Sequence, residues 1–437
     1  MEQDNLRTAW YGVTILFLAW TVSFTDRIIL SLLIIPIQRD LGINDTQISL
    51  LHGAAFAIFY TLMGIPIARL ADRSARRPII IIGMIVWNLA SASCGLAKHF
   101  WHLLVARMMV GVGEAALSPA AYSMIYDWFP KEKLGRAHAF YNSGVTVGAG
   151  LAFIIGGIVV GLTTGLDAVT LPWVGEIRSW QIVFFIAGLM GVPVILLMFT
   201  VTEPARRGGL PAPLPFAQIF RFALLQKRAV FGHLAGFALA SLVFNSFLAW
   251  TPTFLVRVHG FSPGQAGPVL GIGLLVFGSA GMLTGGWLSD KFMRAGHKDA
   301  HLRATLIACV GLVFAAALAP LAPSSGLTVA GLYLFFFFGA FPFGIGAAAL
   351  QMITPAPMRA QYAAVYLLCI NLAGIGTGPT VTALITDYVF GDPLAVGYSL
   401  ALVGVVFSSL SAFVFWFTLK PFQASALRLA EAESRVS

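Results

Sequence analysis

The chain has 437 residues, of which 58% are hydrophobic and 10% charged, and its formal net charge is +9. A soluble globular chain carries about 25% charged residues, so this composition excludes a water-soluble protein. The basic residues stand in the breaks between apolar runs, where the orientation signals of membrane proteins occur. They therefore indicate phospholipid headgroups, and not nucleic acid, as the counter-charge.

Twelve apolar runs follow one another along the chain, each long enough for a helix to cross the hydrocarbon core of a bilayer, which takes about 20 residues. The expected spans are residues 10–37, 47–70, 78–97, 101–126, 135–162, 178–201, 228–257, 264–289, 302–321, 327–353, 360–388 and 394–419. The first run resembles the start of a signal peptide, but it contains Asp26 and Arg27 and lacks a small-residue cleavage site. We therefore interpret it as a retained first span.

A polar stretch rich in proline and glycine separates the sixth and seventh runs. It predicts a bundle over residues 1–202, a linker over 203–227, a second bundle over 228–420 and a tail over 421–437. The loops alternate in Lys and Arg content, as the positive-inside rule requires of a correct span assignment. The poor side holds only Arg39, Lys98, Arg178 and Arg257. Both termini and the linker lie on the rich side and are expected in the cytoplasm.

The loops after the second and eighth runs repeat one charge pattern. In each copy an acid is followed by one base at the next position and by a second base four positions after the acid. The residues are Asp72, Arg73, Arg76 and Arg77 in the first copy, and Asp290, Lys291 and Arg294 in the second. A repeat at the same point of each half indicates a duplicated six-helix unit. We expect the acids to pair with bases or with helix N-termini and so to form a cytoplasmic gate. The alternative is that these charges only orient the spans.

This pattern is similar to the signature loop of the major facilitator superfamily. The resemblance implies an all-α membrane protein of twelve transmembrane helices in two pseudo-symmetric six-helix bundles. In that fold the fifth and eighth spans meet, and each contains glycines four residues apart, Gly157/Gly161 and Gly267/Gly271. Such pairs allow two helices to approach closely. We therefore expect them where the two halves move against each other during transport. The alternative is that they only allow static close packing, with no hinge.

Two stretches of the first half carry a narrower resemblance. Phe24-Thr25-Asp26-Arg27 lies in the first run, and Arg107-Met108-Met109-Val110-Gly111-Val112-Gly113-Glu114 lies in the fourth. Together they resemble the Spinster branch of the superfamily, which implies a bacterial member of a branch associated with export of lysolipids and sphingoid phosphates, often with proton coupling. The fifth run lacks the Gly-Pro pair of the drug-antiporter motif, because Ala149 follows Gly148. That departure disfavours a drug exporter.

Four charged residues lie well inside the apolar runs and away from their ends, Asp26 and Arg27 in the first and Arg107 and Glu114 in the fourth. A charge near the bilayer centre costs about 2.5–3.5 kcal/mol even on lenient insertion scales, so these residues indicate function. We expect Asp26 and Glu114 to carry the coupling protons, with Arg107 pairing with one carboxylate at a time. Arg107 and Glu114 are about 10 Å apart along one helix face, so each needs a partner on another helix. The alternative is a static ion-pair network that fixes helix packing.

The candidate substrate-binding residues differ between the halves. In the first half they are Arg107 and Arg27, which points about 100° away from Asp26 around the helix; pairing of Arg27 with a neighbouring helix is the alternative. In the second half they are the neutral side chains Asn245, Trp250, Tyr366 and Asn371. A cavity between one charged and one apolar wall would suit an amphiphile, although such aromatics equally pack between helices or face lipid.

The sequence therefore predicts a secondary active transporter that moves an amphiphilic, anionic, lipid-like solute by alternating access with proton coupling. The alternative is a proton-coupled transporter of small organic acids or drug-like compounds. No H-E-x-x-H or Walker-type motif occurs, which disfavours an enzyme, a metal site, a cofactor and direct use of ATP. We expect a monomer in the bacterial inner membrane, with lipids, protons and the solute as its partners and no nucleic acid.

Overall fold

The computed structural model describes residues 2–163, 169–171, 175–206 and 216–434. Within these residues, twelve helical spans are long and apolar enough to cross a membrane. The first begins at Leu6 and the last ends at Glu431. The expected all-α fold with twelve transmembrane helices is therefore confirmed.

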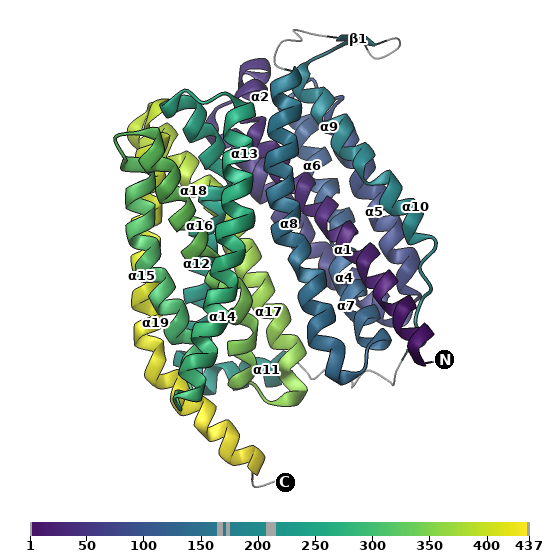
Figure 1. Cartoon of the computed structure of the whole chain (residues 1–437), viewed down its shortest axis with the longest axis vertical. Helices are drawn as coiled ribbons and strands as arrows, with labels where there is room; N and C mark the ends of the chain where they lie inside the picture. The colour runs from purple at the N-terminus through teal and green to yellow at the C-terminus, as the bar shows by residue number, and fades with distance from the viewer. Residues whose placement is uncertain (1, 164–168, 172–174, 207–215, 435–437) are drawn as a thin grey trace. The chain divides into compact units, whose positions relative to one another are not determined.

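Contacts divide the chain into two compact units, residues 1–210 with 251–272 and residues 211–250 with 273–437 (Figure 1). The elements of unit 1 are α1 (Glu2–Leu32), α2 (Ile34–Leu41), α3 (Asp45–Ser49), η1 (Leu50–Ala54), α4 (Ala55–Arg73), α5 (Arg76–Cys94), α6 (Phe100–Glu114), α7 (Leu117–Trp128), α8 (Lys131–Thr163), β1 (Val169–Leu171), β2 (Gly175–Ile177), α9 (Ser179–Met190) and α10 (Val192–Met198), with most of α13 (Pro263–Gly273). β1 and β2 pair antiparallel, with Thr170 opposite Glu176.

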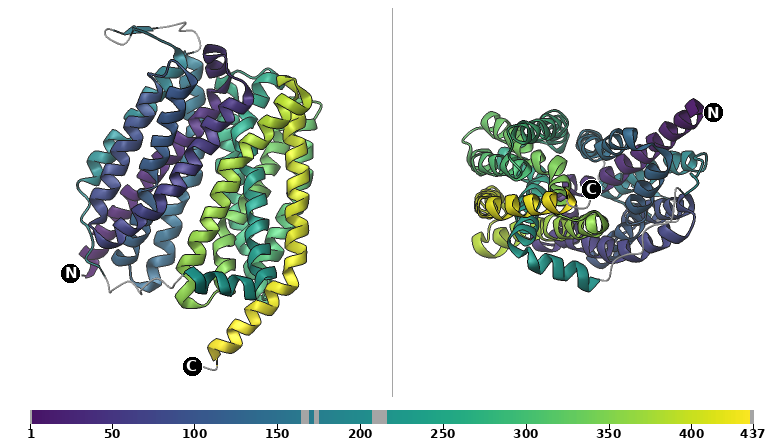
Figure 2. Two further views of the ribbon diagram at one scale, coloured as in Figure 1. Left: turned by 180° about the vertical axis from the view of Figure 1, so that it is seen from behind. Right: turned by 90° about the horizontal axis from the view of Figure 1, so that it is seen from below.

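Unit 2 contains the remaining elements. They are α11 (Phe216–Leu225), η2 (Leu274–Gly278), α14 (Ser279–Arg294), α15 (Ala300–Leu321), α16 (Ser325–Met352), η3 (Ala356–Met358), α17 (Arg359–Asn371), η4 (Leu372–Thr377), α18 (Gly378–Leu384), η5 (Ile385–Phe390), η6 (Pro393–Ala395) and α19 (Val396–Ser434). α12 (Lys227–His259) contributes its first part to unit 2 and residues 251–259 to unit 1. Within unit 2, α15 and α19 pack side by side along much of their length, as both Figure 1 and Figure 2 show.

Residues 251–272, which the sequence division assigns to the second bundle, pack within unit 1. Gly157 on α8 lies directly against Gly267 on α13, because two glycines leave no side chain between the helix backbones. At the end of α12, Arg257 donates two hydrogen bonds of 2.7 Å to the buried carboxylate of Asp45. The expected meeting of the fifth and eighth spans is therefore observed at Gly157 and Gly267.

Prolines explain where two of the spans are interrupted. The expected first span is broken at Leu33, three residues before Pro36, and the fourth is broken after Glu114, with Pro119 following in α7. A proline in a helix clashes with the carbonyl group four residues earlier and cannot donate its own hydrogen bond. Pro119 therefore favours a helix end near Ala115, which leaves Glu114 as the last residue of α6.

Within the expected linker, residues 203–206 form no helix or strand, whereas residues 216–225 form the helix α11. Residues 207–215 lie outside the described residues, but α11 follows them and buries Ile219 and Ala223. The hydroxyl group of Tyr362 on α17 donates a 2.7 Å hydrogen bond to the carbonyl of Ile219. Likewise, the expected tail continues α19 as a helix past Pro421 to Ser434, and residues 435–437 lie outside the description.

Candidate functional site

The first buried ion pair of unit 1 joins α1 to α6. The Nη1 group of Arg107 lies 3.4 Å from the Oδ2 atom of Asp26, and Ser91 on α5 donates a hydrogen bond to the other carboxylate oxygen. Asp26 is 3% and Arg107 1% exposed. The Nε group of Arg107 also donates to the carbonyl of Leu51, 3.4 Å away in the π-helical turn η1. Arg107 thus connects α1, α6 and the second span.

The second buried ion pair joins the next residue of α1 to the end of α6. The Nε group of Arg27 lies 2.5 Å from the Oε2 atom of Glu114, which is fully buried. The hydroxyl group of Ser23 donates to the same oxygen over 2.6 Å. Ser23 and Arg27 are four residues apart and therefore share one face of α1, so both side chains reach Glu114.

Four aromatic rings surround the guanidinium group of Arg27. Its central carbon lies 4.5 Å from the ring centre of Phe56, 4.7 Å from Phe24, 4.9 Å from Tyr60 and 5.5 Å from Trp20. A desolvated cation over one aromatic face gains about 2 kcal/mol. The rings thus offset part of the cost of burying this charge, and they hold Arg27 beside Glu114.

Several polar atoms of this cluster have no hydrogen-bond partner within the described residues. They are the Nη2 groups of Arg27 and Arg107, the Oε1 atom of Glu114 and both ring nitrogens of His52. Most buried polar groups in proteins have partners, either protein atoms or ordered water. The cluster therefore retains donors and acceptors that could bind water or a polar solute group.

The structure brings the four intramembrane charges together as two pairs, Asp26 with Arg107 and Arg27 with Glu114. Arg107 and Glu114 each find a partner on another helix, as their spacing requires, and both partners come from α1. Arg27 pairs with a neighbouring helix, which was the alternative to substrate contact. Sequence reasoning missed Ser23, although its spacing from Arg27 was a usable signal. It could not have found Ser91, since nothing local marks that residue.

In the first signature loop, the buried base is Arg76, while Asp72 and Arg73 are exposed. Arg76 is 1% exposed and forms ion pairs with Asp127 on α7 and, at 3.2 Å, with Glu203 after α10. Asp72, expected as the acid of the gate, makes no ion pair within the described residues. Arg76 forms the ion pairs because it is the first residue of α5, where its side chain reaches both carboxylates. Asp72, by contrast, lies in the last turn of α4.

Two further arginines, Arg206 and Arg77, form hydrogen bonds at the same end of unit 1, next to the first signature loop. Arg206 donates hydrogen bonds to the carbonyl groups of Ala71, Asp72 and Ser74, which the end of α4 leaves without intrahelical partners. Arg77 donates from Nη1 to the carbonyl of Val201 over 2.9 Å. The segment after the sixth span is thus bound to the signature loop.

We expect Arg76→Gln to destabilise the protein by about 2 kcal/mol, because it leaves the buried Asp127 without its cation while the partly exposed Glu203 remains hydrated. Arg73→Gln removes the same charge from an exposed position three residues earlier and should change stability by less than about 0.5 kcal/mol. Thermal unfolding of the two purified variants in one detergent compares them. Equal stability of the two variants would show that the Arg76 ion pairs contribute nothing.

The second signature loop lacks such a buried base. Asp290, Lys291 and Arg294 are all exposed. The ammonium group of Lys291 lies 5.3 Å from the ring of Trp287, and Arg294 donates to the backbone carbonyl of Asp290. The two copies of the sequence repeat therefore have different surroundings within their units.

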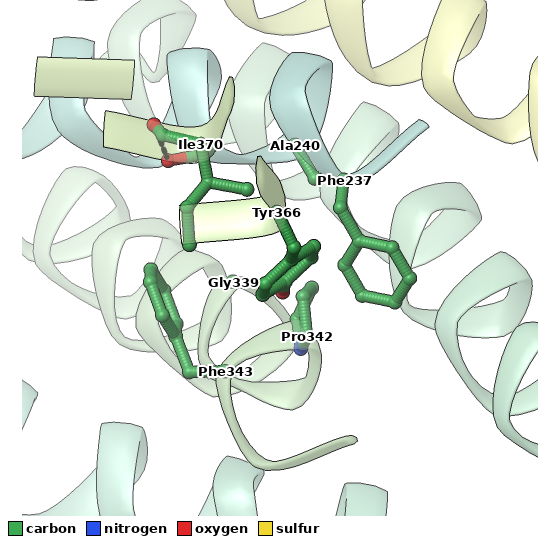
Figure 3. Close-up of a pocket in the computed structure, with 8 residues that line it drawn as sticks. Phe237, Ala240, Gly339, Pro342, Phe343, Tyr366 and Ile370 are labelled. Atoms are coloured by element: carbon green, nitrogen blue, oxygen red, sulfur yellow. Dashed lines mark hydrogen bonds between the residues drawn. The ribbon is translucent and has the colours of Figure 1, made fainter. Parts of the chain in front are cut away.

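Among the candidates of the second half, two are engaged in packing. Trp250 is 1% exposed and its indole N–H donates to the carbonyl of Pro379 over 2.8 Å. Tyr366 is 5% exposed and lines a cavity of about 10 Å³ with Phe237, Pro342 and Phe343 (Figure 3). That volume holds about one water molecule, so no solute fits there.

The two asparagines remain half-buried. Asn245 donates to the carbonyl of Ser241 over 2.9 Å, and Asn371 is the last residue of α17 before the π-helical turn η4. Trp250 and Tyr366 thus support helix packing, whereas Asn245 and Asn371 remain the accessible candidates of unit 2.

The sequence of this chain also matches the model of a known protein family. The model of the Major Facilitator Superfamily matches residues 15–377. The chain belongs to the major facilitator superfamily. It is therefore a multi-pass membrane protein of a family of transporters.

Three comparisons place it within this superfamily. A crystal structure of a bacterial homologue of the human lysosomal transporter Spinster, inward-facing and unoccupied, matches with a TM-score of 0.78 at 27% identity, covering 97% of this chain and 98% of that one. An MFS-type efflux pump of Mycolicibacterium smegmatis is 28% identical, covering 95% of this chain and 94% of the relative. A D-galactonate transporter of Escherichia coli is 27% identical, covering 92% and 94%. The resemblance to the Spinster branch is thus confirmed.

Proposed function

We propose that this protein is a secondary active transporter that moves an amphiphilic, anionic, lipid-like solute across the bacterial inner membrane, coupled to protons. The observation that carries the proposal is the pair of buried carboxylate–guanidinium contacts, Asp26 with Arg107 and Arg27 with Glu114. Two such pairs inside a membrane span are costly. Their retention is best explained by a role in which charge changes during the transport cycle.

Asp26 is the proposed site of proton exchange. Its contact with Arg107 is long for an ion pair, 3.4 Å, compared with 2.5 Å between Arg27 and Glu114. A proton on Asp26 would remove its attraction for Arg107, and the guanidinium group could then bind an anionic solute through its unpartnered Nη2 group. Loss of the proton would restore the ion pair and displace the solute. Binding of the proton and of the solute would thus favour each other.

Glu114 is proposed as the second titrating group, with Arg27 as its fixed partner. The aromatic rings around Arg27 leave its position nearly constant, so a proton on Glu114 would change the net charge of the cluster more than its geometry. Arg107 therefore becomes the main candidate for the solute headgroup, and Arg27 sets the charge that the headgroup meets.

The amphiphilic character of the solute rests on the contrast between the units. All four intramembrane charges lie in unit 1, whereas the candidates of unit 2, Asn245 and Asn371, are neutral. A charged headgroup would suit the residues of unit 1, and an apolar chain would suit those of unit 2. The similarity to the bacterial Spinster homologue supports this proposal. The Spinster branch, which this chain resembles, is associated with export of lysolipids and sphingoid phosphates. We propose a monomer with cytoplasmic termini.

A second candidate solute is a small organic acid. The D-galactonate transporter matches nearly the whole chain, and a sugar-acid carboxylate could bind Arg107 as well as a phosphate could. The two candidates differ in whether a long apolar chain is needed for binding.

The deciding experiment measures uptake into proteoliposomes with an imposed pH gradient. We expect accumulation of a lysophospholipid that increases with the gradient and is competed by other long-chain anionic amphiphiles. Sugar acids should compete at least tenfold more weakly. Equal competition by galactonate would favour the second candidate, and flux that does not respond to the gradient would contradict proton coupling.

A further inference from the structure

An apolar groove runs along the surface of unit 1 between α5 and α6. It is lined by Val86, Leu89, Ala90, Ser93 and Leu96 on one side and by Trp101, His102, Val105, Ala106 and Met109 on the other, with a volume of about 810 Å³. Within each helix the lining residues recur at intervals of three or four positions, so they lie on one face of that helix. Small-molecule sites typically measure about 300–1,000 Å³, so this groove is large enough for a specific ligand.

The length of the groove corresponds to one leaflet of a bilayer. It begins at Val86 near the middle of α5, runs to the end of that helix, and follows α6 from Trp101 to Met109, about 12 Å at 1.5 Å per residue. Half of a hydrocarbon core is about 15 Å. Its rim side chains are exposed and apolar, with Leu89 at 66% and Val105 at 58%. An acyl chain extending from one membrane surface to the bilayer centre would fill such a groove.

The outer end of the groove carries hydrogen-bond donors and positive charge. The segment Gly95–His102 contains Lys98, His99 and His102 and no acidic residue, and all three side chains are exposed. The Nδ1 atom of His102 accepts a 3.3 Å hydrogen bond from the backbone N–H of Lys98, which places the proton of the neutral ring on Nε2 and makes that atom a donor. Trp101, 68% exposed, is of a residue type that anchors at the membrane interface.

We propose that this groove binds one anionic glycerophospholipid, with an acyl chain between α5 and α6 and its phosphate at Lys98 and His102. Charge complementarity selects an anionic headgroup over a zwitterionic one, because the donors at this end have no acidic neighbour in the segment. The deepest residues, Ala90 and Ala106, are only 7% and 6% exposed. They directly precede Ser91 and Arg107, which both contact Asp26, so the lipid would support the helix turns that hold the first ion pair.

The test is native mass spectrometry of the full chain released from nanodiscs of equal phosphatidylglycerol and phosphatidylcholine with identical acyl chains. We expect one phosphatidylglycerol to be retained. Val105→Trp fills the groove and should reduce this retention roughly tenfold, because the chain loses its dispersion contacts. Leu196→Trp is the matched control, since Leu196 is 63% exposed on α10 and lines no part of the groove; it should retain the lipid.

Lys98→Gln tests the headgroup contact separately and leaves the groove unchanged. The preference for phosphatidylglycerol over phosphatidylcholine should fall about fivefold, the effect of one basic residue near a membrane surface. Equal retention of the two lipids by the wild type would overturn the proposal. So would retention by Val105→Trp that equals retention by Leu196→Trp, since the lipid would then be a nonspecific boundary lipid.

Discussion

Asp26→Asn is expected to abolish solute accumulation driven by a pH gradient while exchange of solute between the two sides of the membrane continues. The amide has nearly the shape of the carboxylate, and its single oxygen can still accept the hydrogen bond from Ser91, so the local packing should persist. Its NH2 group cannot accept the hydrogen bond from Arg107. The amide also cannot bind or release a proton, and it no longer competes electrostatically for Arg107. Coupling is therefore lost, whereas solute binding and the conformational change are retained.

The measurement compares two modes of the same proteoliposomes, gradient-driven uptake and counterflow at equal pH. Uptake by Asp26→Asn should fall to the level of protein-free liposomes, with counterflow retained. Glu176→Gln is the matched control, because Glu176 lies on β2 with its side chain 60% exposed; both modes should remain as in the wild type. Undiminished gradient-driven uptake by Asp26→Asn would rule out Asp26 as the coupling site. Parallel loss of both modes would indicate a static structural pair.

The largest effect on stability is expected from Arg27→Met. This substitution leaves the carboxylate of Glu114, which is fully buried, without its cation. Removing one partner of a buried ion pair costs about 3–5 kcal/mol, mostly because the remaining charge is left unpaired. The double variant Arg27→Met/Glu114→Gln removes that charge as well, so it should recover most of the lost stability. The two sites are in direct contact, and non-additivity is therefore expected.

Thermal unfolding of the single and double variants in one detergent checks this expectation. Arg39→Met serves as the control, because it removes an exposed arginine from α2 and should shift stability by less than about 0.5 kcal/mol. A double variant less stable than Arg27→Met would contradict the ion-pair interpretation. If the double variant proved both stable and fully proton-coupled, Glu114 would be only a structural partner, and Asp26 alone would carry coupling.

The positions of the spans and of the intramembrane charges could be predicted from the sequence, because both follow from short stretches of chain. A span needs only an apolar run of sufficient length, and Asp26 and Glu114 stand out because a charge in such a run is costly wherever its partner lies. The interruption of the fourth span near Glu114 is also local, since Pro119 disfavours a continuous helix there.

The tertiary structure alone decided which charge meets which. Arg27 and Glu114 are 87 positions apart, and their contact depends on how α1 and α6 are rotated against each other. The same holds for Arg76, whose partners Asp127 and Glu203 lie in two other segments, so the loop pattern could not distinguish it from Arg73. The physical reason is that helix periodicity fixes the face on which a side chain lies, whereas the residue opposite that face is determined by packing between helices far apart in the chain.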